Sequence, residues 1–190
     1  MISTSKSLTD NLGQAAKTVP LVVAGAALMT LAAKVQIPFW PVPMTLHTLA
    51  VMGFAACLGP RVATSIFLTY LALGAAGYPV FSGTPERGIG LAYMVGPTGG
   101  YLAGFLIASW LVGTLSAGRG FFGTLASMLV GLGLTYAMGV AWLAIFVPFD
   151  KLLAYGFTPF ILGDFVKIGI AAAACTLIAN WRKSRRTVAQ

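Results

Sequence analysis

Asp164 and Lys167 are the two residues whose types and spacing point most clearly to chemistry. They lie three positions apart inside a long apolar stretch, residues 159–175. A charge at membrane depth costs roughly 2.5–3.5 kcal/mol on insertion scales, so an ionisable pair there predicts a binding or transport site. Because a spacing of three places both side chains on one helix face, they offer a ligand a carboxylate acceptor beside an ammonium donor.

A structural role is the alternative for this pair, which could neutralise itself and hold the helices together. We favour a ligand or transport site for two reasons. Lys167 lies too deep to reach the membrane surface easily along its own stem. Apolar residues would also pack at this position with a smaller desolvation penalty.

Arg87 is a third charged candidate, in a segment of about 20 residues (78–97) between two apolar runs. A guanidinium binds a carboxylate through two parallel hydrogen bonds, so Arg87 suits an acidic ligand; the alternative is a solvated pair with Glu86. Connections of this length are usually functional or disordered. Since aromatic residues such as Phe81 and Tyr93 argue against disorder, we expect 78–97 to form a lid over a pocket.

His47 is the single histidine of the chain and lies early in an apolar segment. By itself it is more typical of a hydrogen-bonded helix residue than of a catalyst. A dyad with Asp164 would need an activated serine or cysteine nucleophile, and none stands at a supporting spacing. We therefore expect no enzyme activity.

The two cysteines, Cys57 and Cys175, both fall in apolar segments without a CxxC or Cys/His spacing. This pattern predicts neither a metal site nor a disulfide. We expect both to be small packing residues.

The composition is that of an integral membrane protein, with 58% hydrophobic and 8% charged residues and a mean hydropathy of +0.88. Lys and Arg number 12 against 4 Asp and Glu. Because these basic residues lie in short flanks between apolar runs, we expect no nucleic-acid role. The glycine-rich stretches 88–90 and 96–100 lack the Gly-Lys-Ser/Thr of an ATPase loop, so any use of ATP must occur on a partner.

Six apolar segments approach the length of about 20 residues that spans a bilayer. They are residues 19–35, 44–58, 62–77, 99–115, 121–146 and 159–181. The second is short and follows a proline-rich stretch, 38–43, which we expect to be a loop dipping toward the membrane surface. Without a visible repeat or linker, residues 1–190 are predicted to form one compact, all-α bundle of six transmembrane helices, its first span uncleaved.

The basic residues set the predicted orientation, since six spans place both termini on one side. Eight of the twelve lie on that side: Lys6, Lys17, Arg61, Arg119, Arg182, Lys183, Arg185 and Arg186. We therefore expect a cytoplasmic N-terminal segment (1–18), a basic cytoplasmic tail (182–190) and an outer lid. A last helix starting at Thr158 and Pro159 would place Asp164 roughly 8 Å and Lys167 roughly 12 Å below its outer end.

Five ordered motifs carry a resemblance that covers nearly the whole chain. They are residues 41–51 (PVPMTLHTLAV), 58–61 (LGPR), 73–81 (LGAAGYPVF), 96–104 (GPTGGYLAG) and 163–167 (GDFVK). In this order they resemble the BioY family, the biotin-binding S components of energy-coupling factor (ECF) transporters. The resemblance implies a six-helix bundle of S-component type in the bacterial cytoplasmic membrane, binding biotin from outside.

The same resemblance implies partners and site residues. Family members work with a transmembrane T component and two cytoplasmic ATPase subunits, and the S component is thought to reorient within the membrane. By position, Asp164 and Lys167 match the family's polar pair, and Arg87 falls where an arginine is common. Two departures are His47, where the family usually has glutamine, and the weak match of Ala26 and Thr30 to the small residues that dock the T component.

The residues fit the chemistry of biotin, which joins a ureido group, an apolar ring and a carboxylate. We expect Asp164 to accept from the ureido N–H groups, Lys167 to donate to the ureido carbonyl, and Arg87 to take the carboxylate; the reverse, with Lys167 on the carboxylate, stays open. Candidates for the apolar wall are Phe81, Tyr93, Tyr101 and Trp40, with His47 at the rim. Biotin is the transported ligand, and no cofactor or metal is expected.

Two other functions remain alternatives. One is an S component for a different small vitamin, because pocket details set specificity within one fold. The other is a stand-alone proton-coupled carrier in which Asp164 titrates.

Overall fold

The chain is described by a computed structural model that places residues 2–38 and 40–188, with side chains described for 18–38 and 40–185. The side chains of Lys6, Lys17 and Arg186, used above for the orientation, lie outside the described residues, as do residues 1, 39, 189 and 190. Within the described residues, six long helices make up the bundle. They are α1 (Ile2–Lys34), α2 (His47–Leu58), α3 (Pro60–Ala75), α5 (Gly99–Leu115), α6 (Phe121–Leu143) and α8 (Thr158–Val188).

The all-helical prediction is confirmed, and each predicted apolar segment forms one of these helices. The bounds of α5 agree with the prediction, while α1 begins well before residue 19. Two stretches of the described chain, Phe121–Leu143 and Phe149–Arg185, are long and apolar enough to cross a membrane by length and composition. Three shorter apolar helices, Thr18–Lys34, His47–Leu58 and Gly99–Leu115, accompany them.

Short elements that the sequence analysis did not predict lie in the connections. The strands β1 (Gln36–Ile37) and β2 (Met44–Thr45) pair antiparallel on either side of the proline-rich loop. The segment 78–97, called the lid segment below, contains one short helix, α4 (Leu91–Met94). A 3-10 turn, η1 (Phe149–Lys151), and the helix α7 (Leu152–Gly156) connect α6 to α8.

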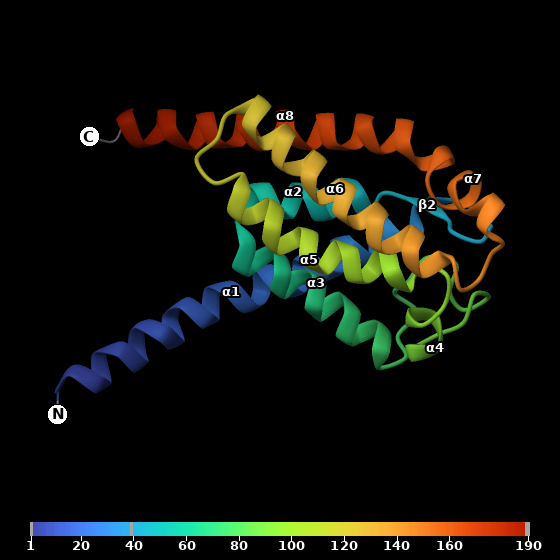
Figure 1. Cartoon of the computed structure of the whole chain (residues 1–190). Coiled ribbons are helices and arrows are strands. Elements are labelled where there is room, and N and C mark those ends of the chain that lie inside the picture. The colour runs from blue at the N-terminus through green and yellow to red at the C-terminus, as the bar shows by residue number, and fades with distance from the viewer. Residues whose placement is uncertain (1, 39, 189–190) are drawn as a thin grey trace.

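The two ends of the bundle differ in what they carry. Both termini lie at one end, whereas β2, α4 and α7 lie at the other (Figure 1). The lid segment and the connection from α6 to α8 therefore share the end of the bundle that is opposite the termini.

Close packing of α5 on α6 depends on a glycine. A Cβ at Gly104 would lie 2.8 Å from the Cα of Thr135, so a larger residue would push the two helices apart. Helix α2 packs against both α5 and α8, while α1 packs against α3. The side chains that α2, α5, α6 and α8 direct inward therefore meet in the middle of the bundle.

Helix α8 presents two different faces. Leu162, Val166 and Ile170 recur every four residues and are more than half exposed, at 77%, 57% and 56%. On the opposite face Asp164 and Ile168 are buried. An apolar stripe this exposed is unfavourable in water but suits lipid, so this face of α8 can contact the bilayer. The charged pair lies on the other face, toward the bundle interior.

The prediction that the cysteines only fill space is wrong. Cys57 on α2 and Cys175 on α8 form a disulfide, with 5.2 Å between their Cα atoms. They are 118 residues apart in the chain, so their local sequence spacing carries no signal of the contact. It is the packing of α2 on α8 that brings them together.

Candidate functional site

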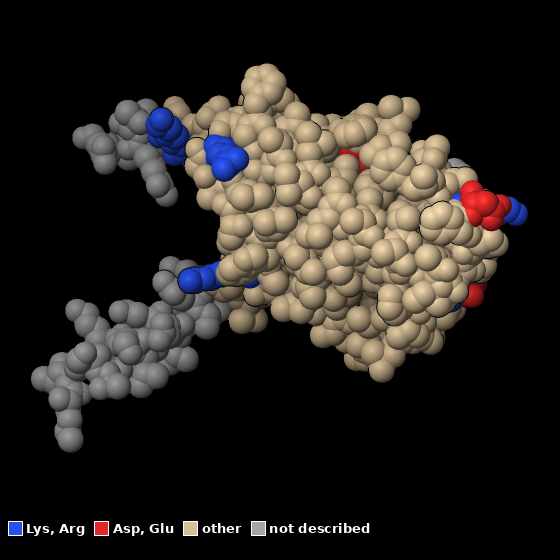
Figure 2. Space-filling model, in the orientation of Figure 1, with Lys and Arg blue, Asp and Glu red and all other residues tan. Residues whose placement is uncertain are grey.

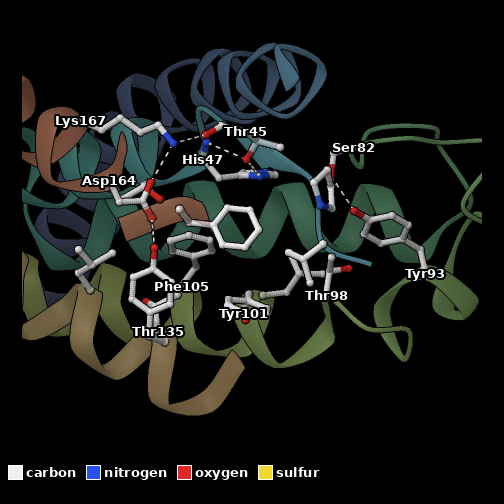
Figure 3. A pocket seen from close by; sticks show the side chains of 17 residues that line it. Thr45, His47, Ser82, Tyr93, Thr98, Tyr101, Phe105, Thr135, Asp164 and Lys167 are labelled. Atoms are coloured by element: carbon white, nitrogen blue, oxygen red, sulfur yellow. Dashed lines mark hydrogen bonds and ion pairs between the residues drawn. The ribbon is translucent and has the colours of Figure 1, made fainter. Parts of the chain in front are cut away.

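A cavity opens between the inward-facing side chains at the lid end of the bundle and encloses about 580 Å³ of atom-free space, part of it open to solvent. Figure 3 shows its lining. The lining residues are Val42, Pro43, Thr45, His47, Thr48, Ser82, Tyr93, Thr98, Tyr101, Leu102, Phe105, Leu132, Thr135, Tyr136, Phe160, Asp164 and Lys167.

The predicted charged pair forms one end of this cavity. Lys167 Nζ lies 2.8 Å from Asp164 Oδ1, and it also donates a 2.7 Å hydrogen bond to the backbone carbonyl of Thr45. The other carboxylate oxygen, Oδ2, accepts a 2.7 Å hydrogen bond from the hydroxyl of Tyr136. Since Asp164 is only 6% exposed, these partners hold both charges in a fixed position and replace the water they lose on burial.

His47 lies on the wall beside this pair, and both of its ring nitrogens are engaged. Nδ1 hydrogen-bonds with the hydroxyl of Thr45 at 3.0 Å, and Nε2 with the hydroxyl of Tyr70 at 2.9 Å. Its ring also meets that of Tyr70 edge-on. The geometry agrees with the expectation of a hydrogen-bonded helix residue.

Aromatic rings form much of the remaining wall. Tyr101 and Tyr136 meet edge-to-face with their centroids 6.4 Å apart. The hydroxyl of Tyr101 donates a 2.6 Å hydrogen bond to the carbonyl of Gly156 at the end of α7, and this bond fixes the orientation of the ring. Phe105 and Phe160 add apolar surface. A flat, apolar ligand ring would therefore be held by dispersion and by edge-to-face contacts.

Hydroxyl groups line the opposite end of the cavity, next to the lid segment. Ser82 and Tyr93 share a 2.7 Å hydrogen bond between their hydroxyls, and Thr98 lies nearby on the lining (Figure 3). Behind Tyr93, the ring of Phe81 stacks at 4.7 Å between centroids. Phe81 in turn occupies the place where a side chain at Gly74 would stand, so the lid segment is packed tightly onto α3.

A lysine fixes this lid segment to the first helix. Lys34, in the last turn of α1, donates hydrogen bonds to the carbonyls of Phe81 and Thr84 at 3.1 and 3.3 Å, and to the Thr84 hydroxyl at 2.8 Å. Phe81 and Thr84 flank Ser82 in the sequence. The position of the cavity's outer hydroxyls thus depends on an ammonium from α1.

Five of the eight predicted site residues line this cavity: Asp164, Lys167, His47, Tyr93 and Tyr101. The other three do not. Phe81 is buried behind Tyr93. Arg87 lines an adjacent hollow together with Trp40, where its guanidinium lies 5.6 Å from the centre of the Trp40 ring and Nη1 donates a 3.1 Å bond to the carbonyl of Pro41.

The two residues proposed for partner docking lie mostly inside the bundle. Ala26 is 1% exposed, and the half-buried Thr30 donates its hydroxyl to the carbonyl of Ala26 at 3.0 Å. The pair therefore offers little surface to a partner subunit in this conformation.

Tyr136 and Thr45 are the important site residues that sequence reasoning missed. A tyrosine in an apolar helix is common, and a backbone carbonyl such as that of Thr45 leaves no signature in the sequence. The available signal was the charged pair itself, since buried charges need hydrogen-bonding partners from other helices. Tyr136 is such a partner, a hydroxyl that points inward from another span.

Chemically, the cavity offers a ligand charged groups, hydroxyls and aromatic surface. No group of three or more His, Cys, Asp or Glu side chains that could hold a metal ion occurs among the residues the structure describes. The cavity instead combines one charged, hydrogen-bonded end, an aromatic middle and a hydroxyl-lined end. Fold and site together define a helical, membrane-embedded protein that binds a small molecule.

Comparison with known proteins identifies the family. The family model described as "BioY family" matches residues 4–184, and the chain belongs to this family. It is 41% identical over 165 residues to the "Probable biotin transporter BioY" of Pyrococcus horikoshii, covering 87% of this chain and 95% of that protein. To the "Biotin transporter BioY" of Thermotoga maritima it is 40% identical over 148 residues, covering 77% and 86%.

A solved structure agrees with the sequence relatives. It is the crystal structure of "the S-component for biotin from an ECF-type ABC transporter", with a TM-score of 0.76 and 26% sequence identity, covering 88% of this chain and 93% of that one. The resemblance drawn from the five motifs is thereby confirmed. So is the expectation of an S-component type of fold.

Proposed function

We propose that this protein captures biotin with high affinity from the outer face of the bacterial cytoplasmic membrane and carries it inward as the S component of an ECF transporter. A transmembrane T component and two cytoplasmic ATPase subunits would complete the transporter and supply the energy. The proposal is supported by the family and by the named function of its relatives. Within this chain, the observation that carries it is the hydrogen-bonding capacity left at the Asp164–Lys167 pair.

That capacity matches a ureido group. A carboxylate has about four acceptor positions and an ammonium three donors. Asp164 uses one position on each oxygen for Lys167 and Tyr136, while Lys167 uses two donors, on Asp164 and on the Thr45 carbonyl. About two acceptor positions and one donor remain, and a ureido group presents two N–H donors and one carbonyl.

The rest of biotin fits the rest of the cavity in the same orientation. Its fused, sulfur-containing ring is apolar and suits the wall around Tyr101 and Phe105. The aliphatic chain would then point its carboxylate toward the hydroxyls of Ser82, Tyr93 and Thr98 at the other end. From the adjacent hollow, Arg87 would attract this carboxylate across Tyr93 and Thr98, which line both spaces.

Charge distribution supports the proposed orientation in the membrane. Among the described side chains, Lys and Arg dominate the terminal end of the bundle, whereas the visible Asp and Glu cluster mainly at the lid end (Figure 2). Positive charge collects on the cytoplasmic side of membrane proteins. We therefore assign both termini to the cytoplasm and the lid segment to the outside, which makes the chain a multi-pass protein with an outward cavity.

Ligand identification tests the proposal. The full chain is purified in detergent, and mass spectrometry of the small molecules released on denaturation should find biotin. Labelled biotin should bind the wild type, while Asp164→Asn should weaken binding by about 100-fold, since a charged hydrogen bond to the ureido group is lost and Lys167 is left unpaired. Asp150→Asn, a change to an exposed carboxylate at the lid end, is the control and should bind as the wild type.

The same measurements separate the alternatives. Release of a different vitamin would replace biotin with that ligand and keep the transport role. Uptake that persists without ATPase subunits and collapses with an uncoupler would replace the ECF mechanism with a proton-coupled one. Tight biotin binding that survives Asp164→Asn would remove this pair from the site.

A further inference from the structure

A second hollow lies immediately outside the biotin cavity. It encloses about 630 Å³ of atom-free space, partly open to solvent. Trp40, Pro41, Glu86, Arg87, Tyr93 and Thr98 are among its lining residues. Because Tyr93 and Thr98 line the inner cavity as well, these two side chains form a wall that the two compartments share.

The outer hollow carries both signs of charge. Arg87 is half-buried and held in place by the Pro41 carbonyl and the Trp40 ring. Glu86, the adjacent residue, is exposed and lines the same space. Trp40 is 74% exposed and adds a broad apolar surface. The hollow therefore offers a cation, an anion and a flat ring to whatever extends past Tyr93.

This combination does not match free biotin alone. The carboxylate of biotin would be attracted by Arg87 but repelled by Glu86, since like charges at short range disfavour binding. A zwitterion, carrying one carboxylate and one ammonium close together, satisfies both side chains at once. Amino acids have this arrangement at their α-carbon.

We propose that the outer hollow binds an amino acid whose side-chain amine forms an amide bond with the carboxyl group of biotin, so that the protein also takes up biotinyl-amino acids linked in this way. The biotin head occupies the inner cavity and the linking chain passes between Tyr93 and Thr98. Arg87 binds the α-carboxylate and Glu86 the α-ammonium. This inference rests on the proposed function, because it assigns biotin to the inner cavity.

Three conjugates that share the biotin head group separate the contributions of the carboxylate and the ammonium. The probes are ε-N-biotinyl-lysine, which is zwitterionic; biotin amide-linked to 6-aminohexanoate, which keeps only the carboxylate; and biotin amide-linked to 1,5-diaminopentane, which keeps only the ammonium. Affinities for these and for free biotin are measured by calorimetry on the full chain in detergent. We expect wild-type protein to bind biotinyl-lysine at least as tightly as either singly charged conjugate.

Substitutions then assign the charges. Glu86→Gln should lower the affinity for biotinyl-lysine and for the ammonium conjugate about fivefold, which is the effect of one exposed ion pair. It should not lower the affinity for free biotin or for the carboxylate conjugate. Arg87→Ala should lower the affinity for biotinyl-lysine and for the carboxylate conjugate about tenfold, and it should leave the affinity for the ammonium conjugate unchanged. Lys151→Ala, which removes an exposed charge at the same end of the bundle, is the matched control and should change none of the four affinities.

The outcomes distinguish this inference from the proposed function. If free biotin binds tightly but biotinyl-lysine binds more than 100-fold more weakly, the outer hollow does not accept the amino acid and the inference is wrong while biotin capture stands. Equal effects of Glu86→Gln on all four ligands would also overturn it. If no biotin compound binds, the proposed function itself has failed.

Discussion

The hydroxyl of Tyr136 donates a 2.7 Å hydrogen bond to Oδ2 of Asp164, joining α6 to the charged pair on α8. Lys167 already occupies the other oxygen, Oδ1. The carboxylate is therefore held between two donors from different helices. Its orientation toward the cavity depends on Tyr136 as much as on the lysine beside it.

Replacing Tyr136 by phenylalanine tests this dependence. The change keeps the ring and removes one hydrogen bond to a buried carboxylate, an interaction worth about 1.5–3 kcal/mol. We expect biotin affinity to fall at least tenfold while the protein still folds, as calorimetry and a thermal melt in detergent would measure. Tyr155→Phe, at an exposed position on α7, is the control. Unchanged affinity in Tyr136→Phe would mean that the hydroxyl does not position Asp164.

A double-mutant cycle separates ligand binding from structural pairing at Asp164 and Lys167. Asp164→Leu or Lys167→Met alone leaves a buried charge without its partner and should destabilise the fold by about 3 kcal/mol. The double variant removes both charges and should recover much of this loss, yet bind no biotin. Unfolding in denaturant and labelled-biotin binding are measured for all four proteins. A double variant that still binds biotin would show the pair to be structural only.

Residues that are unusual for their surroundings are the ones that can be predicted from the sequence. Asp164 and Lys167 stand out because charges in apolar helices are rare and costly. The six helices were predictable from apolar length, and α5 agreed at both ends. These features depend on local composition, which can be read from the sequence without knowledge of tertiary contacts.

The rest depends on contacts between distant segments. The disulfide of Cys57 with Cys175 requires α2 to lie beside α8, and neither residue's neighbours reveal this. Arg87 was expected in the ligand cavity, yet its guanidinium lies in an adjacent hollow because the lid segment folds it against Trp40 and Pro41. Side-chain direction in an irregular loop follows from tertiary packing, which composition does not encode.

Arg87→Ala examines how far that guanidinium acts on biotin from the adjacent hollow. If it attracts the carboxylate, the substitution should weaken free biotin about fivefold and leave biotin amide, which has no charge there, nearly unchanged. Competition binding with both ligands gives the comparison. Equal losses for the two would assign Arg87 a structural role in the lid segment.

Lys34→Met tests whether the anchoring of the lid segment controls ligand release. Lys34 holds the carbonyls of Phe81 and Thr84 as well as the Thr84 hydroxyl, so its loss should let the segment open more often. We expect biotin to dissociate at least tenfold faster, since the loss of even one charged hydrogen bond costs about 1.5 kcal/mol or more. Stopped-flow displacement measures this rate. The control, Lys151→Met, removes a lysine from the same end of the bundle and should leave dissociation unchanged.

The disulfide between Cys57 and Cys175 should stabilise the contact of α2 with α8. A cross-link closing a loop of 118 residues is worth about 5 kcal/mol in the chain-entropy account. Intact mass after alkylation of denatured, unreduced protein should show no modified cysteine, and reduction should expose both. Reduced wild type should melt at a lower temperature than oxidised protein, whereas the double variant Cys57→Ala with Cys175→Ala should not respond to reductant. A melting temperature that reductant leaves unchanged would contradict the pairing. Lys167 lies two turns from Cys175 on α8 and donates a hydrogen bond to the Thr45 carbonyl just before α2. A loosened α2–α8 contact should therefore also weaken biotin binding.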